Sequence, residues 1–198
     1  MHTQTHVIMG AALFGRAIPR RARIAALGGL LPDLPMLLMV LVLKLIGIPA
    51  PIIFGVLYWQ EWWQVTNAIA HNVWLWGGLL VAALIWHERR NTTAQGMDRA
   101  SLLAAFSASG LLHLAIDFLC HREDAHMSFW PVSRWKFISP VSYYDPAHYG
   151  QYVSLFEAAM GLTLAALVFS RFRNRWTRIA LALAMLLYVA VPAYFMLN

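Results

Sequence analysis

Hydrophobic residues in this chain gather in long runs, separated by short breaks that contain basic residues or proline. A helix needs about 20 residues to cross the hydrocarbon core of a bilayer. Five runs reach or approach that length: 24–47, 68–87, 100–120, 152–170 and 177–197. A sixth run, 7–15, is too short to cross alone. The pattern predicts an all-α integral membrane protein with about five transmembrane helices plus a short N-terminal half-helix or re-entrant segment.

Prolines, glycines and polar residues refine this pattern. Pro32-Asp33-Leu34-Pro35 interrupts the first run, and because proline cannot continue a helix, neighbouring helices must shield the freed backbone groups. The pairs Gly28-Gly29 and Gly77-Gly78 predict close helix packing. Residues 121–151 are too polar and too rich in proline to cross, so we expect them to form an outer interfacial loop. Residues 1–198 then make a single transmembrane domain.

The composition agrees with a lipid environment. Hydrophobic residues make up 60% of the 198 residues and charged residues only 12%, against roughly 25% charged in an average soluble domain. The formal net charge of +6 could indicate a nucleic-acid partner. The basic residues, however, lie in short clusters between apolar runs and form no continuous basic face. We therefore expect the lipid bilayer as the partner and no nucleic acid.

Basic residues at the ends of the runs predict the orientation. Eleven of the fifteen Lys and Arg residues fall on one side of the predicted topology, and the positive-inside rule places this side in the cytoplasm. They are Arg16, Arg20, Arg21, Arg23, Arg89, Arg90, Arg99, Arg171, Arg173, Arg175 and Arg178. The loops 48–67 and 121–151 then face outward. Five tryptophans would form an outer aromatic belt: Trp59, Trp62, Trp63, Trp130 and Trp135.

Ionisable side chains inside the apolar runs are the main functional signal, because charge at this depth is costly and often marks function. At ~1.5 Å per helical residue from the cytoplasmic end, two lie near the midplane and four lie roughly 21–27 Å along their helices. The six are His6, Asp33, His71, His113, Asp117 and Glu157, and His121 follows at the outer boundary. The sequence thus predicts one polar layer between the midplane and the outer face.

The sharpest motif in this layer is His113-Leu-Ala-Ile-Asp117-Phe-Leu-Cys-His121. Its spacing of four residues puts the three side chains in a stripe on one helix face. Neutral imidazoles and carboxylates suit zinc and other first-row divalent metals, and a bound metal makes its water a nucleophile near neutral pH. Glu157 or Asp33 could act as general base or complete the coordination. The alternative is a structural Asp–His hydrogen bond that ties helices together.

Other candidate residues also have plainer interpretations. His6, which follows Thr5, and Asp33, between two prolines, could cap helix starts. His71 stands near a helix start, where polar residues are ordinary. Three outer-loop residues are expected to be solvated rather than catalytic: His126, Asp145 and His148. The aromatic loop itself could either cover the predicted site or only anchor the chain at the membrane interface.

Five short motifs follow one another over about two thirds of the chain. They are Thr5-His6 with Gly10, Gly29-Leu-Leu-Pro32-Asp33, Ala70-His71-Asn72, His113-Leu-Ala-Ile-Asp117 and Trp130-Pro131-Val-Ser133. In these motifs and their order the chain resembles the YdjM-like family of LexA-binding, inner-membrane-associated, metal-dependent hydrolases. The resemblance implies a multi-pass protein of a bacterial-type inner (cytoplasmic) membrane. It also implies His6, Asp33, His71, His113 and Asp117 as metal ligands.

Three functions remain open at this point. The first is a metal-dependent hydrolase whose site opens outward and acts on a lipid-linked or envelope substrate, with zinc or another first-row metal as cofactor. The second is a small transporter that uses the same buried acids, although five spans without a repeat speak against it. The third is a non-catalytic membrane scaffold in which the polar layer only locks the helices together.

Overall fold

The computed structural model describes the backbone of residues 1–90 and 98–197, and the side chains of residues 1–89 and 98–190. Over these residues the chain is helical and contains no strand, as predicted. The helices are α1 Thr3–Phe14, α2 Pro19–Leu30, α3 Leu34–Leu45, α4 Ala50–Gly55, α5 Glu61–Ala70, α6 Val73–Arg90, α7 Arg99–Cys120, α8 Gly150–Arg171 and α9 Arg175–Leu197. Two short 3-10 turns, η1 Leu57–Trp59 and η2 Pro146–His148, complete the elements.

Local sequence accounts for several helix starts. Proline at one of the first two helical positions, where its missing N–H costs nothing, opens α2, α3 and α4. Asp98 opens α7, because its carboxylate accepts a hydrogen bond of 2.9 Å from the backbone N–H of Ser101. These starts leave the chain free to turn just before each helix.

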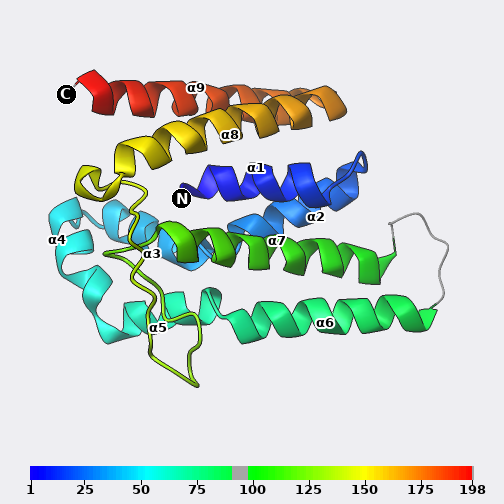
Figure 1. Ribbon diagram of the computed structural model, residues 1–198, viewed down its shortest axis with the longest axis horizontal. Coiled ribbons are helices and arrows are strands. Elements are labelled where there is room, and N and C mark those ends of the chain that lie inside the picture. The colour runs from blue at the N-terminus through cyan, green and yellow to red at the C-terminus, as the bar shows by residue number, and fades with distance from the viewer. Residues whose placement is uncertain (91–97, 198) are drawn as a thin grey trace.

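Helix α1 lies at the centre of the molecule (Figure 1). It contacts α2, α7 and α8, while α6 packs on the far side of α7 and α9 packs on α8. Seven of the twelve residues of α1 are buried: Thr5, His6, Ile8, Met9, Gly10, Ala11 and Ala12. A helix with apolar residues on all sides is expected inside a protein. The predicted short N-terminal half-helix is therefore present, and it is packed within the bundle.

Three helical stretches are long and apolar enough to cross a membrane. They are Glu61–Arg89, Arg99–Cys120 and Gly150–Arg171. Helices α2 and α3 make a fourth crossing only if they count as one broken span, because they are bent by 66°. The break falls at the predicted Pro32–Pro35 segment. The fifth predicted span, 177–197, corresponds to α9. This helix is not among the candidate spans of the described residues, so the structure supports three or four spans and not five.

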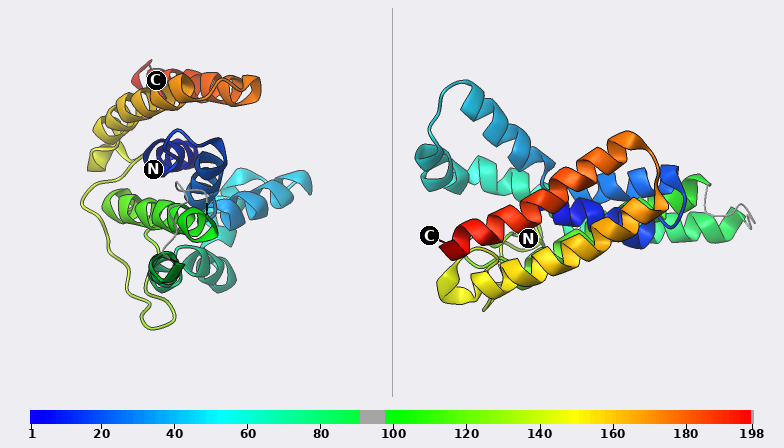
Figure 2. Two further views of the ribbon diagram at one scale, coloured as in Figure 1. Left: turned by 90° about the vertical axis from the view of Figure 1, so that its right-hand side faces the viewer. Right: turned by 90° about the horizontal axis from the view of Figure 1, so that it is seen from above.

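The segment 48–67, which the sequence predicted to be a loop, is largely helical. It folds into α4, η1 and α5, which stand with α3 as an arm at one end of the molecule (Figure 2, right). Ile53, Tyr58 and Trp63 form a buried cluster in this arm, and apolar residues of α3 pack against it. Trp63 is fully buried, so it does not belong to an aromatic belt. Apolar residues within 48–67 form this small core, which the hydropathy pattern alone does not predict.

The two predicted glycine pairs differ in their packing. A Cβ added at Gly28 would overlap the backbone carbonyl of Phe106 in α7, and one at Gly29 would overlap the carbonyl of His6 in α1. Nothing lies within 4 Å of a Cβ added at Gly77 or Gly78. The close helix packing expected at Gly28-Gly29 is therefore present, whereas the expectation for Gly77-Gly78 is wrong.

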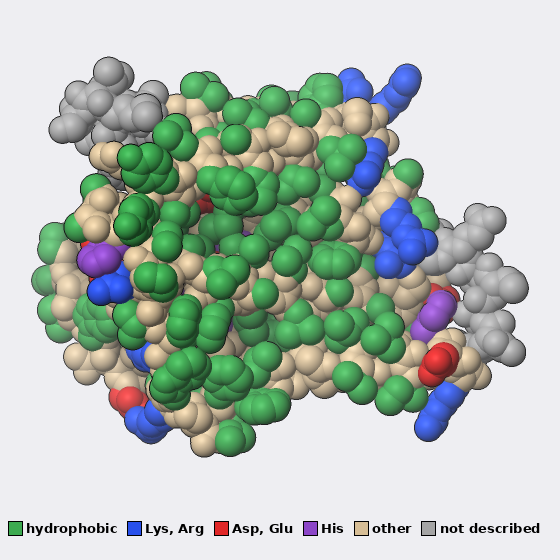
Figure 3. Space-filling view, viewed as in Figure 1, with side chains coloured by type: hydrophobic (Ala, Val, Ile, Leu, Met, Phe, Trp, Pro, Cys, Tyr) green, Lys and Arg blue, Asp and Glu red, His purple; other side chains and the backbone are tan. Residues whose placement is uncertain are grey.

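The surface carries many apolar side chains along the length of the helices (Figure 3). Leu41, Val42, Leu84 and Leu186 are each more than half exposed. Lys and Arg side chains gather at the end of the molecule where α8 turns into α9 (Figures 1 and 3). A largely apolar surface with basic side chains gathered at one end is typical of a protein that lies in a bilayer.

The contact of α2 with α7 gives a first prediction. Gly28→Ala should lower stability by about 1–3 kcal/mol, because the backbone of Phe106 cannot give way as a flexible side chain would. Gly77→Ala is the matched control and should hold or slightly raise stability, since Ala is the better helix former. Thermal unfolding of both variants in detergent would measure this. Equal melting temperatures would contradict the close approach.

Candidate metal centre

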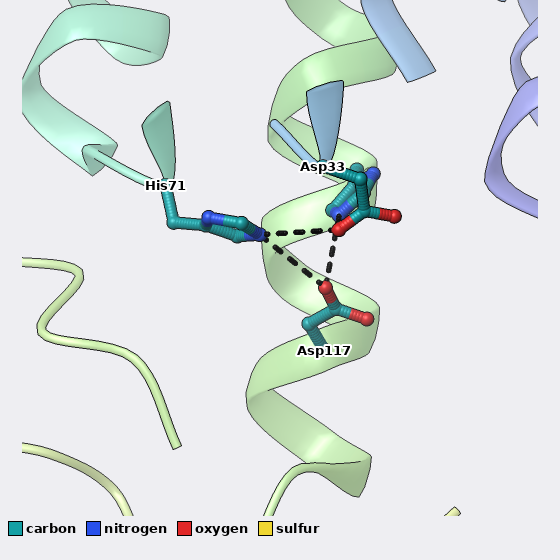
Figure 4. Close-up of side chains that lie close together, drawn as sticks. Asp33, His71 and Asp117 are labelled. Atoms are coloured by element: carbon teal, nitrogen blue, oxygen red, sulfur yellow. Dashed lines mark ion pairs between the residues drawn. The ribbon is translucent and has the colours of Figure 1, made fainter. Parts of the chain in front are cut away.

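Four predicted residues meet in one buried group: Asp33, His71, His113 and Asp117. One ligand atom from each lies within 4.8 Å of the others, and all four residues are buried. Figure 4 shows Asp33, His71 and Asp117 pointing toward one another from separate elements. Asp33 lies in the break between α2 and α3, His71 in the break between α5 and α6, and Asp117 in α7. The convergence that helix depth predicted is therefore present in space.

The break at Asp33 delivers its carboxylate to this group. Asp33 precedes α3, but its side chain makes no cap hydrogen bond, so the capping interpretation is wrong. Instead Oδ2 accepts a hydrogen bond of 2.6 Å from the Thr3 hydroxyl, which leaves Oδ1 to face the histidines. The capping interpretation of His6 is wrong as well, because α1 begins at Thr3 and places His6 inside the helix.

Backbone carbonyls fix the tautomers of the two histidines. His71 Nδ1 lies 3.0 Å from the carbonyl oxygen of Asn67, and His113 Nδ1 lies 2.7 Å from that of Gly29. A carbonyl oxygen can only accept, so both Nδ1 atoms must donate. In the neutral rings the Nε2 atoms then carry lone pairs. This arrangement, in which the outer nitrogen is tied to the backbone, is characteristic of metal-ligating histidines.

The two Nε2 atoms face carboxylate oxygens. His113 Nε2 lies 2.9 Å from Asp117 Oδ2 and 3.6 Å from Asp33 Oδ1. His71 Nε2 lies 3.7 Å from Asp33 Oδ1 and 3.8 Å from Asp117 Oδ2. Lone pairs and negative oxygens repel each other at such distances, so a positive charge must lie among them. Either a proton on each ring or a metal ion can supply it.

The distances favour a metal ion over protons. At 3.7 and 3.8 Å, a proton on His71 Nε2 has no acceptor within hydrogen-bond range, and this buried atom has no hydrogen-bond partner. His113 Nε2 lies within hydrogen-bond distance of Asp117 Oδ2, at 2.9 Å, but the two groups are not aligned as a hydrogen bond. Ligand atoms around a tetrahedral ion with bonds of about 2.0–2.2 Å stand roughly 3.3–3.6 Å apart. The four residues therefore fit a first-row divalent ion, which Asp33, His71, His113 and Asp117 would hold.

The other oxygen of Asp117 faces two further predicted residues. Asp117 Oδ1 lies 2.9 Å from His6 Nε2 and 3.2 Å from His121 Nε2. His6 is buried and stacks on His113, with ring centroids 3.7 Å apart. The amino nitrogen of Met1, which the sequence did not indicate, also lies 2.9 Å from Asp117 Oδ1. Each predicted histidine ligand thus contacts a carboxylate oxygen of Asp33 or Asp117.

Glu157 lies apart from this group. Its carboxylate accepts hydrogen bonds from the backbone N–H of His2 (2.9 Å) and the Thr5 hydroxyl (2.5 Å), and it contacts His2 Nδ1 at 3.0 Å. The Thr5 hydroxyl in turn contacts the Tyr188 hydroxyl at 2.7 Å. Glu157 therefore joins α8 to the start of α1 and to α9. The sequence does not predict these partners, because they depend on how three separate helices pack.

The connection from α7 to α8 covers the centre. A narrow pocket beneath this connection, with room for about one water molecule, is lined by His71, Leu114, Asp117, Phe118, His121, Ala125, His126, Ser128 and Phe137. Phe137 stacks on Phe118, with ring centroids 4.5 Å apart, and Asn72 donates a hydrogen bond to the carbonyl of Trp130. These contacts support the interpretation of the loop as a cover over the site rather than only as an interfacial anchor.

His126 was expected to be a solvated loop residue, but it belongs to the site. It lines this pocket and stacks on His71, with ring centroids 3.9 Å apart. The other two loop residues lie away from the centre. His148 contacts Asp145 at 2.6 Å, and this hydrogen bond lowers the pKa of the Asp145 carboxyl. His126 differs from His148 and Asp145 only in where the folded loop places it, and the sequence does not show this.

No family model, curated protein or solved structure matches the chain. The fold and the site together define the class of molecule: a helical bundle with membrane-crossing character and a buried His/Asp group that fits a divalent ion.

Metal binding to this group should stabilise the fold. An ion present at about 100 times its dissociation constant adds about 2.7 kcal/mol, so zinc should raise the melting temperature of chelator-stripped protein by several degrees. His113→Ala should lose this zinc-dependent rise because it removes one of the four ligands. His148→Ala, which changes an outer-loop histidine, is the control and should keep it. An equal rise in His113→Ala and in the wild type would contradict the assignment of the ligands.

The contacts of Glu157 predict a different response. Glu157→Ala leaves the donors at His2 and Thr5 without their buried acceptor and should cost about 1–3 kcal/mol in the free energy of unfolding. Because Glu157 lies outside the four-residue group, the metal content of the folded variant should equal that of the wild type. Loss of metal without loss of stability would show that Glu157 is a ligand.

Proposed function

We propose that this protein is a membrane-embedded, metal-dependent hydrolase with a His/Asp centre, acting on a lipid-linked or envelope substrate. One observation carries the proposal: His71 Nε2 is buried, has no hydrogen-bond partner, and faces Asp33 and Asp117 at 3.7 and 3.8 Å. Buried polar atoms without partners are rare and call for an explanation. A divalent ion explains this one together with the matching arrangement at His113.

The residues of the centre divide their roles by position. Asp33, His71, His113 and Asp117 hold the ion, and the carbonyls of Asn67 and Gly29 hold the two imidazole rings in orientation. When bound, the ion supplies a Lewis acid and a water of lowered pKa.

We assign proton transfer to His126, a residue of the pocket wall. The sequence had suggested Asp33 or Glu157 for this role. His126 stacks on a ligand but is not one itself, so its ring nitrogens remain available to a substrate. Asp33 is engaged by Thr3 and by the ion, and Glu157 is engaged by His2 and Thr5. Glu157 therefore serves to anchor the start of α1.

The location of the site supports the substrate class. The pocket lies under the aromatic connection between α7 and α8, and the basic end of the bundle is opposite (Figures 1 and 3). With the basic end in the cytoplasm, the protein is a multi-pass protein of a bacterial-type inner membrane whose long loop faces outward. A substrate would then reach the site from the outer leaflet or the envelope.

The proposal includes kinship with the YdjM-like family. Four of the five motifs on which the resemblance rests place a residue at this one centre: His6, Asp33, His71, and His113 with Asp117. The fifth motif contains Trp130, whose carbonyl accepts a hydrogen bond from Asn72 beside His71. Motifs that are far apart along the chain thus meet at one place, as an inherited site would require.

Hydrolysis should depend on both the ion and His126. Protein reconstituted in vesicles is mixed with chromogenic carboxylic-ester and phosphodiester probes and with envelope lipid extract, and products are followed by absorbance and mass spectrometry. Chelation and His113→Ala should each abolish product release. His126→Ala should reduce the rate by about 10²–10⁴-fold and remove one limb of the pH–rate profile, whereas His148→Ala should be unaffected.

Other outcomes would point to the alternative functions. A turnover rate that persists in metal-free protein would contradict the hydrolase. Uptake of a solute into the same vesicles, lost in Glu157→Gln, would indicate a transporter. Variants of the centre that lose stability while no activity is found in the wild type would indicate a scaffold.

A further inference from the structure

The two carboxylate oxygens of Asp117 face different sets of side chains. Oδ2 points to the proposed centre, 2.9 Å from His113 Nε2 and 3.8 Å from His71 Nε2. Oδ1 points away from it, 2.9 Å from His6 Nε2 and 3.2 Å from His121 Nε2. A single ion on the Oδ2 side leaves the imidazoles on the Oδ1 side without a function.

His6 is the clearest sign that the Oδ1 side binds something. Its side chain is fully buried, and neither of its ring nitrogens has a hydrogen-bond partner. Nε2 lies 2.9 Å from Asp117 Oδ1, yet the two atoms are not aligned as a hydrogen bond. A close imidazole–carboxylate pair without a shared proton is expected when both groups are directed at a third, positive partner.

His121 and Cys120 complete the potential ligands on this side. Cys120 Sγ, His121 and Asp117 each offer an atom, and these atoms lie within 4.8 Å of one another. The Asp124 carboxylate stands 3.1 Å from His121 Nδ1, the ring nitrogen that does not face Asp117. Thiolate, imidazole and carboxylate together form a donor set that suits zinc.

The Met1 amino group shows that positive charge is favoured at this place. Its nitrogen lies 2.9 Å from Asp117 Oδ1, 3.2 Å from His121 Nε2 and 3.3 Å from Cys120 Sγ. An ammonium group there compensates one charge of the cluster. It makes no contact with His6 among the hydrogen bonds and ion pairs of the described residues, so the two orphaned ring nitrogens of His6 remain unexplained by it.

We propose that Asp117 bridges two metal ions, the second held on its Oδ1 side by His6 and His121 with Cys120 beside them, in place of the Met1 ammonium group. This inference rests on the proposed function, because it adds a second ion to the same centre. A carboxylate that bridges two ions is common where a pair of ions holds both the attacking and the leaving oxygen of a hydrolytic reaction. Asp117 and His121 also line the narrow pocket beside His126.

The number of ions per chain tests the second site. Full-length protein is loaded with Mn²⁺ or Zn²⁺, freed of excess metal and measured by elemental analysis. The wild type should hold two ions per chain, His121→Ala one, Asp117→Ala none, and the control His87→Ala two. Electron paramagnetic resonance of the Mn²⁺-loaded wild type should show two exchange-coupled ions, a readout that requires no variant to fold.

The outcomes separate the two proposals. One ion per chain with an uncoupled spectrum overturns the second site and leaves the proposed function standing; the Met1 ammonium then balances the Oδ1 side alone. No bound ion in the wild type overturns both. Two uncoupled ions, or two ions retained in His121→Ala, overturn the bridge, because the second ion must then lie elsewhere.

Discussion

The buried negative charge of Asp33 and Asp117 is the constraint on which the rest of the structure depends. A carboxylate in an apolar interior carries a large desolvation penalty unless positive charge and hydrogen bonds compensate it. Here two carboxylates lie within reach of each other among helices. Thr3, His71 and His113 surround one of them, and five nitrogen-bearing residues and a cysteine surround the other. The bundle is arranged around the need to neutralise this pair.

Broken helices are the means by which the chain brings these groups together. Both Asp33 and His71 lie where a helix stops and another begins. Breaks at this depth are tolerated only where protein surrounds the freed backbone. The carbonyl of Gly29, near one break, is used by His113, so the break also orients a ligand.

The sequence predicted the helical class, the break at Pro32–Pro35 and the layer of polar residues, because hydropathy and the 3.6-residue repeat are local properties. It also predicted that His6, Asp33, His71, His113, Asp117 and His121 belong together. It did not predict the helical arm at 48–67, the role of His126 or the partners of Glu157. These depend on the course of a long loop and on which helices are neighbours, and neither leaves a periodic trace in the chain. Depth along a helix places a residue in a layer of the membrane but not at a point within that layer. The sequence alone therefore could not separate Glu157 from the candidate ligands.

Elemental analysis of the purified wild type beside Asp117→Ala tests the central claim most directly, since Asp117 is the residue that every other candidate ligand faces, directly or through a neighbour. A buried group of carboxylates and lone-pair imidazoles that holds an ion predicts a stoichiometric first-row metal in the wild type and its loss in the variant. A wild type that is folded and free of stoichiometric metal, or a variant with unchanged metal content, would contradict the account.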